Sequence, residues 1–167
     1  MKNKKIILGI AIAVVIFVGL YFGVLNRSDV PTDVPTLEEG FGIWESEIMF
    51  ADAEPGCVDT APLTIICGKD SARNFTVSIE QPRSDKLKDG YAAFPEDYYS
   101  WITLPEAQPI VIEAGGYRTL DIQFAVPTSA NYSGQQMEAR IRVSEINLTG
   151  LIQLALESRW YIVIAEQ

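Results

Sequence analysis

The sequence contains no histidine, which removes the commonest general base, the commonest zinc ligand and every nucleophile system of the Ser-His type. It also lacks a glycine-rich phosphate loop, a G-x-S-x-G nucleophile turn and an H-E-x-x-H metal motif. Carboxylate pairs, a Ser-Lys pair or tyrosine are the groups left for catalysis. We therefore predict that the protein is not an enzyme and has no cofactor. The least favoured alternative is an extracellular hydrolase that uses carboxylates for catalysis.

Basic residues are scarce beyond the N-terminus. The chain of 167 residues has 13 Lys and Arg against 22 Asp and Glu, a net charge of −9. All 22 acidic residues and 10 of the basic ones follow residue 25, so that part carries −12. A negative surface of this kind disfavours nucleic acid. The acidic residues that lie close in sequence lack EF-hand spacing, which indicates solvated surface acids and no metal site. They are Glu38, Glu39, Asp52, Glu54, Asp59, Glu96 and Asp97.

A long apolar segment lies near the N-terminus. Ile6 to Leu25 is a run of 20 residues without a charge, and as a helix it would be about 30 Å long, enough to cross a bilayer. Lys2, Lys4 and Lys5 precede it, which predicts a cytoplasmic tail over 1–5 and an exported C-terminal part. Two alternatives are a cleaved signal peptide, whose apolar region is usually shorter, and a pilin-type leader, which needs a small residue before the run.

Two glycines stand near the outer end of the predicted anchor. Gly19 and Gly23 form a G-x-x-x-G pair, a spacing that lets two membrane helices pack closely. The alternative is that they have no special role, because glycine is common in membrane helices. Residues 26–40 follow, with Pro31, Pro35 and several acids, and this composition predicts an extended stalk.

Every asparagine beyond residue 25 begins an N-x-Ser/Thr sequon. The four are Asn26, Asn74, Asn131 and Asn147. Because this pattern is the acceptor for N-linked glycans on exported proteins, it agrees with the predicted export. We expect Asn26 to be the least used, since it lies against the membrane. The prediction is a single-pass membrane glycoprotein with its C-terminal domain outside the cell.

Cysteine is also rare, with Cys57 and Cys67 as the only two. An even pair in an oxidising compartment usually forms a disulfide, which here would close a short loop and stabilise it by roughly 2–3 kcal/mol. The alternative, a redox or metal pair, would need C-x-x-C spacing or companion ligands. We therefore predict a structural disulfide.

From residue 41 onward the dominant hydrophobic period is two. Apolar residues alternate with polar ones over 74–80, 120–126 and 140–144, which is typical of half-buried strands. Further strands are predicted over 43–50, 99–104, 109–113, 152–156 and 160–165, separated by Gly and Pro turns. Short strands without a long helical segment predict an all-β fold over 41–167, an antiparallel sandwich of about seven to nine strands.

The segment over 83–98 has the weakest pattern and becomes aromatic toward its end. Tyr91, Phe94 and Tyr98 are the rings of interest. Aromatic side chains on a surface loop can form a binding edge for a partner. The more common role is to cap the end of the sandwich core, because aromatic rings usually supply buried area.

The order of strands and turns over residues 72–165 resembles the immunoglobulin-like or fibronectin-like β-sandwich modules of prokaryotic, and more narrowly archaeal, membrane-anchored surface proteins. A tryptophan strand leads to a glycine turn, then to a strand ending in Val-Pro, a glycine loop and an outgoing strand. The stretches that carry the resemblance are Asn74–Pro82, Trp101–Pro105, Ile110–Gly116, Leu120–Pro127, Gly134, Ala139–Val143 and Trp160–Ala165. The two cysteines depart from the antibody pattern, in which the disulfide joins the two sheets.

The resemblance implies an adhesive, architectural or complex-forming role, although one fold hosts many functions. We expect an extracellular sandwich, fixed by the 6–25 helix, that binds a protein partner or serves as a subunit of a surface assembly. The alternative is a subunit of a pilin-like or archaellum-like filament, or of an envelope machine, that assembles through its N-terminal helix.

Overall fold

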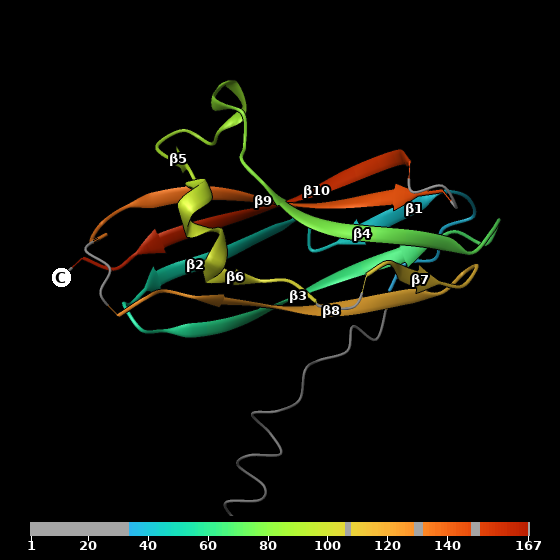
Figure 1. Ribbon diagram of the computed structural model, residues 1–167, viewed down its shortest axis with the longest axis horizontal. Helices are drawn as coiled ribbons and strands as arrows, with labels where there is room; N and C mark the ends of the chain where they lie inside the picture. The colour runs from blue at the N-terminus through green and yellow to red at the C-terminus, as the bar shows by residue number, and fades with distance from the viewer. Residues whose placement is uncertain (1–33, 106–107, 129–131, 148–150, 167) are drawn as a thin grey trace, which may run out of the picture. The chain divides into compact units, whose positions relative to one another are not determined.

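The computed structural model describes residues 34–105, 108–128, 132–147 and 151–166, which form a β-sandwich of two sheets (Figure 1). The all-β class is therefore confirmed. The predicted tail 1–5, the anchor 6–25 with Gly19 and Gly23, the stalk as far as residue 33 with Asn26, and Asn131 lie outside the described residues. Within the described ranges, no helix is long and apolar enough to cross a membrane.

The first sheet is antiparallel, with the strand order β1-β3-β8-β6. Its strands are β1 (Phe41–Trp44), β3 (Val58–Cys67), β8 (Tyr117–Ala125) and β6 (Ile102–Thr103). β3 and β8 are paired from Val58↔Ala125 to Ile66↔Tyr117 and form the centre of this sheet.

The second sheet has the order β2-β10-β9-β4-β7. Its strands are β2 (Glu47–Ala53), β10 (Ile152–Ile164), β9 (Gln136–Ile146), β4 (Arg73–Glu80) and β7 (Ile110–Ile112). The short β5 (Ala92–Ala93) also pairs with β9. β2 and β5 run parallel to their neighbours, and the other pairs are antiparallel. Two 3-10 helices, η1 (Ser84–Lys86) and η2 (Glu96–Trp101), lie between β4 and β6.

The core lies between the two sheets and is filled by the alternate residues of each strand. Phe124, Ile122 and Ile141 are fully buried, as the period of two predicts. The Phe50 ring packs on Phe124 at 4.8 Å and on Trp160 at 5.2 Å between ring centroids, so strands from both sheets meet in one aromatic cluster.

The chain passes from the first sheet to the second within the predicted strand over 43–50. Glu45 has φ 60°, a left-handed conformation that ends β1, and β2 then begins at Glu47 in the other sheet. Two contacts hold this corner against β10: Ser158 Oγ donates to the Glu45 carbonyl at 2.8 Å, and the Arg159 N–H donates to the Ser46 carbonyl at 2.7 Å. A strand that bends between sheets in this way closes the edge of a sandwich.

The predicted disulfide between Cys57 and Cys67 is wrong. Both thiols are free, because the residues between them form the ten-residue strand β3 in place of a closed loop. At about 3.3 Å per residue the ends of such a strand are roughly 30 Å apart, far beyond the reach of one disulfide. Cys57 is half-buried at one end, whereas Cys67 is fully buried at the other and donates its thiol to the Ser71 carbonyl at 3.2 Å.

Three other expected strands differ from the structure. The stretches 152–156 and 160–165 are one continuous strand, β10, which pairs with β9 along its length. The stretch 99–104 is mostly the helix η2, and β6 keeps only two strand residues. Trp101 at the end of η2 is buried, so the helix still supplies core area.

Candidate functional site

The first half of β10 has a free edge. β9 pairs with β10 from Ile152 onward, whereas β2 pairs with it only from Arg159. Between Ile152 and Ser158, no strand of the described part of the chain pairs with the side of β10 that faces away from β9, although β1 lies close to β10. With a rise of about 3.3 Å per residue, this stretch offers roughly 20 Å of unpaired strand.

The backbone groups on this edge follow from the pairing with β2. The N–H of Arg159 donates to the Ser46 carbonyl, so its backbone polar groups lie on the β2 side of β10. These groups alternate from one side of a strand to the other with each residue. Those of Ala155 and Glu157 therefore lie on the same side as those of Arg159, facing the free edge.

The side chains that accompany this edge are apolar and exposed. Leu151, Ile152 and Leu154 have 66%, 59% and 49% of their surfaces exposed, and Leu156 packs against the core. A β-bulge lies between Ile152 and Leu154. Residues 151–158 are called the β10 edge below. An unpaired edge with exposed apolar side chains is the kind of surface that accepts another strand.

The other free edges are protected in the ways common to natural sheets. The outer edge of β2 carries Glu47 and Asp52, and Asp52 has φ 54°, which breaks the regular strand. The unpaired parts of β3 and β8 carry Asp59 and Arg118. β6 and β7 are only two and three residues long. Charges, irregular backbone and short strands all discourage pairing with another chain. The β10 edge also has a β-bulge and one charged residue, Glu157, but it differs in the exposed apolar side chains at its start.

Two predicted glycosylation sites fall on described residues. Asn147 lies at the turn between β9 and β10, where its N–H donates to the Leu151 carbonyl and its side-chain Oδ1 accepts the Leu151 N–H, both at 2.9 Å. A glycan there would lie beside the β10 edge. Asn74 is half-buried within β4, opposite Val111 and Ile146. Occupancy of both sequons stays a prediction.

The aromatic residues proposed as partner-facing divide into two groups. Phe94 is fully buried and packs edge-on against Trp101 at 5.8 Å, so its predicted exposure to a partner is wrong. Tyr98 is half-buried and stacks on Trp101 at 4.5 Å, and a hydrogen bond with Tyr132 raises the pKa of its hydroxyl. Both rings therefore extend the core at this end of the sandwich, as aromatic rings commonly do.

Tyr91 lies apart from these rings. It is half-buried against Tyr161 of β10, with ring centroids 5.2 Å apart. The Lys88 ammonium lies 4.3 Å from the centre of the Tyr161 ring and 5.1 Å from that of Tyr91. A cation over an aromatic face is attracted by the ring. Contact of Tyr91 with a partner stays a prediction.

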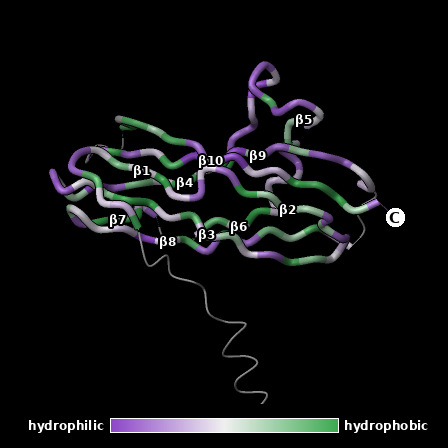
Figure 2. Tube along the Cα trace, turned by 180° about the vertical axis from the view of Figure 1, so that it is seen from behind, coloured by the Kyte–Doolittle hydropathy of each residue, from purple (hydrophilic) through white to green (hydrophobic). Residues whose placement is uncertain are grey.

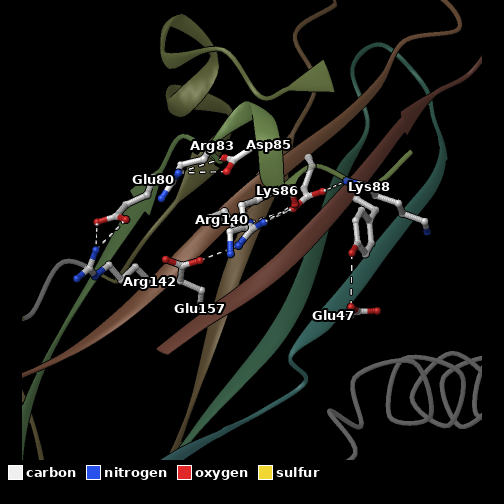
Figure 3. A network of polar contacts seen from close by, with 11 residues as sticks. Glu47, Glu80, Arg83, Asp85, Lys86, Lys88, Arg140, Arg142 and Glu157 are labelled. Carbon is white, nitrogen blue, oxygen red and sulfur yellow. Dashed lines mark hydrogen bonds and ion pairs between the residues drawn. The ribbon is translucent and has the colours of Figure 1, made fainter. Parts of the chain in front are cut away.

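Charged side chains gather on the outer face of the second sheet (Figure 3). Arg140 of β9 is held on three sides: its Nε donates to Glu138 Oε1 at 2.9 Å, its Nη1 to Glu157 Oε2 at 2.8 Å and its Nη2 to the Lys86 carbonyl at 3.0 Å. Arg142 Nη1 donates to both carboxylate oxygens of Glu80 at 3.0 Å. Arginine thus joins β4, β9 and β10 across this face.

The segment between β4 and β5 is tied to this network. Figure 2 shows it as a largely hydrophilic excursion from the sheet. The N–H of Lys88 donates to Glu138 Oε2 at 2.9 Å, which fixes the returning chain. Sequence reasoning placed Arg140 and Arg142 on the polar face of a strand but found no partners for them, because all of those partners except Glu138 lie 17 to 62 residues away along the chain.

Among the residues that the structure describes, no group of three or more His, Cys, Asp or Glu side chains is arranged to hold a metal ion. The two cysteines lie at opposite ends of β3 and cannot share a metal ion.

No protein-family model and no curated protein sequence matches the chain. Solved structures do match its fold. The PapD-like domain 7 of human CEP192 is 18% identical with a TM-score of 0.53, and the match covers 82% of this chain and 92% of that one. A putative carbohydrate binding protein from Bacteroides ovatus is 15% identical with a TM-score of 0.51, over 79% of this chain and 37% of the other. A family 123 glycoside hydrolase from Clostridium perfringens is 10% identical with a TM-score of 0.50, over 77% and 27%.

These similarities establish the fold alone. The chain has the immunoglobulin-like sandwich of PapD-like domains, which confirms the immunoglobulin-like part of the expected resemblance. It spans about a third or less of the two larger bacterial proteins, so in them the same sandwich is one part of a longer chain. At such low identity, function has to be argued from the residues of this chain.

Proposed function

We propose that this protein is a membrane-anchored extracellular β-sandwich that binds a protein partner and has no catalytic activity. The partner supplies an extended segment, which pairs with the β10 edge as an additional strand of the second sheet. The single observation that supports this mode is the free edge over Ile152–Ser158, flanked by exposed leucine and isoleucine side chains.

Strand addition uses both features of this edge. Backbone hydrogen bonds to Ala155 and Glu157 would supply affinity, and side chains at alternate positions of the incoming strand would supply specificity. Leu154 is exposed beside Leu156, which packs on the core. An apolar residue of the partner could cover Leu154 and extend the core by one contact. The chain has an excess of negative charge, so we expect a partner segment with apolar residues and basic neighbours.

Anchoring and export rest on the sequence. The uncharged run over 6–25 has the length of a membrane helix, and three lysines directly precede it, against one basic residue, Arg27, just after it. The sequons agree with an extracellular domain. The lack of histidine supports the absence of catalysis.

The proposal is tested by comparing the companions of wild-type and variant chains. The full-length protein is purified gently from its own membranes, and proteins that co-purify at fixed stoichiometry are identified by mass spectrometry. In one variant, Leu154→Lys places a charge on the β10 edge. A second variant, Ala155→Pro, removes an amide that faces the free edge and takes no part in pairing with β9, so the fold should tolerate it. The control is Val111→Lys on β7, where valine is 56% exposed.

We expect both β10 variants to lose a companion that wild type and Val111→Lys retain, with melting temperatures close to wild type. A companion that binds all four proteins equally would refute the edge as the binding surface. If the companion lost is a second copy of this chain, the protein is a subunit of a self-assembling filament. Asn147→Gln removes the neighbouring sequon and shows whether a glycan there limits binding.

A further inference from the structure

A pocket of about 380 Å³ lies on the outer face of the second sheet, beside the charged network. It lies between the strands β4, β9 and β10 and the segment that leaves β4. Its lining residues are Glu80, Gln81, Pro82, Arg83, Lys86, Arg140, Arg142, Glu157 and Arg159. We call it the arginine pocket. Glu157 belongs to both sites, because its side chain lines the pocket and its backbone lies on the β10 edge. Arg159 and Lys86 lie outside the β10 edge, so variants at these two residues test the pocket independently of the proposed function.

The charge of the arginine pocket is opposite to that of the whole protein. Its lining has five cationic side chains and two carboxylates, in a chain whose net charge is −9. Arg140 and Arg159 are also direct cross-strand neighbours in the pairing of β9 with β10. Like charges in that position repel and destabilise a sheet. The positive charge of this lining therefore differs in sign from that of the whole chain, and the pair Arg140 and Arg159 places two like charges side by side.

The two carboxylates of the lining are already engaged. Glu80 accepts from Arg142 with both oxygens, and Glu157 accepts from Arg140. Each carboxylate thus orients an arginine, and Arg140 is further fixed by the buried Glu138 beneath it. At the rim, the exposed Arg83 pairs with Asp85. These pairs build a rigid frame in which the direction of each guanidinium group is set in advance.

Some cationic groups of the arginine pocket are not used by these ion pairs. Within the described ranges, Lys86 and Arg159 form no ion pair, and the Nε of Arg142 is buried without a hydrogen-bond partner. A hydrogen bond with Tyr161 raises the pKa of Arg159, which keeps it charged. Buried donors of this kind are rare unless something accepts from them. Lys86, Arg142 and Arg159 therefore offer N–H donors to the same pocket.

We propose that the arginine pocket binds a phosphate or sulfate group. A tetrahedral oxyanion suits this pocket better than a single carboxylate does, because its several oxygens can accept from donors on different strands. Arg142 and Arg159 contact it from neighbouring strands, and Lys86 closes over it from the segment beyond β4. The group is either a free ion or part of a small molecule such as a sugar phosphate, since both present the same oxygens.

The test measures anion binding to the full-length protein in detergent by isothermal titration at pH 7. The probes are sodium phosphate, sodium sulfate and glucose 6-phosphate, each compared with sodium chloride at equal ionic strength. Arg159→Gln and Lys86→Gln each remove one donor, and Arg118→Gln on the first sheet makes the same change of charge at an exposed site outside the pocket. Melting temperatures without added anion show whether each variant is folded.

Phosphate or sulfate should bind where chloride does not, and each pocket variant should weaken binding by about tenfold or more, whereas Arg118→Gln should leave it unchanged. Arg159→Gln should also unfold cooperatively without added anion, which would show that weaker binding comes from the lost donor and not from a lost fold. Tighter binding of glucose 6-phosphate than of phosphate would identify a carrier molecule as the ligand, and equal binding would identify the free ion. The same response to chloride, or equal binding by all variants, would overturn the proposal.

Discussion

Glu138 should be among the most sensitive polar residues of the domain, and Glu138→Gln tests this. The carboxylate is fully buried, and its Oε1 accepts from the Nε of Arg140 at 2.9 Å and forms an ion pair with the Arg140 Nη2, also at 2.9 Å. Its Oε2 accepts the Lys88 N–H at 2.9 Å. Glutamine has the same shape, but it is neutral and has only one acceptor oxygen. Either Arg140 or Lys88 must then face a donor amide.

The expected loss follows from the burial of Arg140. Its side chain is only 9% exposed, so the substitution leaves a buried positive charge with Glu157, itself 39% exposed, as the remaining anion. Removing one partner of a buried ion pair typically costs about 3–5 kcal/mol. For a domain of this size that corresponds to a fall in melting temperature of about 10 °C or more. It is also a large part of the roughly 5–15 kcal/mol that stabilises a domain.

The assay is urea unfolding of the full-length protein, followed by tryptophan fluorescence, since Trp101 and Trp160 are buried in the core. Glu113→Gln is the control, because Glu113 is exposed and should change stability by less than about 0.5 kcal/mol. The double variant Glu138→Leu with Arg140→Met removes both charges and should recover most of the loss. A loss below about 1 kcal/mol in Glu138→Gln, or no recovery in the double variant, would refute the reasoning.

Two further predictions concern the core. Phe124 is fully buried against Phe50 and Trp101, so Phe124→Ala should cost about 3–5 kcal/mol in urea unfolding, and a change near zero would contradict its assigned position. The thiols should be separable by alkylation without reductant, with Cys57 modified in the native protein and Cys67 only after unfolding. Burial raises the pKa of the Cys67 thiol and shields it, and a mass showing an oxidised pair would contradict the free thiols.

The strands that alternate regularly could be predicted from the sequence. In β4, β8 and β9, apolar residues recur at every second position, and those at Val77, Ile122, Phe124 and Ile141 are buried. The reason is that each of these strands has one face on the core and one on solvent or polar side chains. The all-β class and the sandwich follow from the same local rule.

β3 and η2 could not be predicted in the same way. Val58–Cys67 is exposed at its start and buried on both faces toward its end, so its apolar residues do not alternate. The cysteines at either side then favoured a disulfide that the extended strand makes impossible. In η2, aromatic residues pack on the core from a short helix. The local spacing of these residues does not distinguish such a helix from a strand.

Neither candidate site could be assembled from the sequence. The sequence around Leu151, Ile152 and Leu154 is typical of a strand and does not show whether its edge is paired. The edge is free because β2 pairs with β10 only from Arg159 and leaves the earlier residues unpaired. The arginine pocket depends on the register that places Arg140 opposite Arg159, and on a segment from beyond β4 that folds back over them. By itself, the sequence determined the regularly alternating strands, the side of each of them that is buried, and the charges available. Only the tertiary structure decided which edges stay free and which charges meet, because both depend on contacts between residues far apart in the chain.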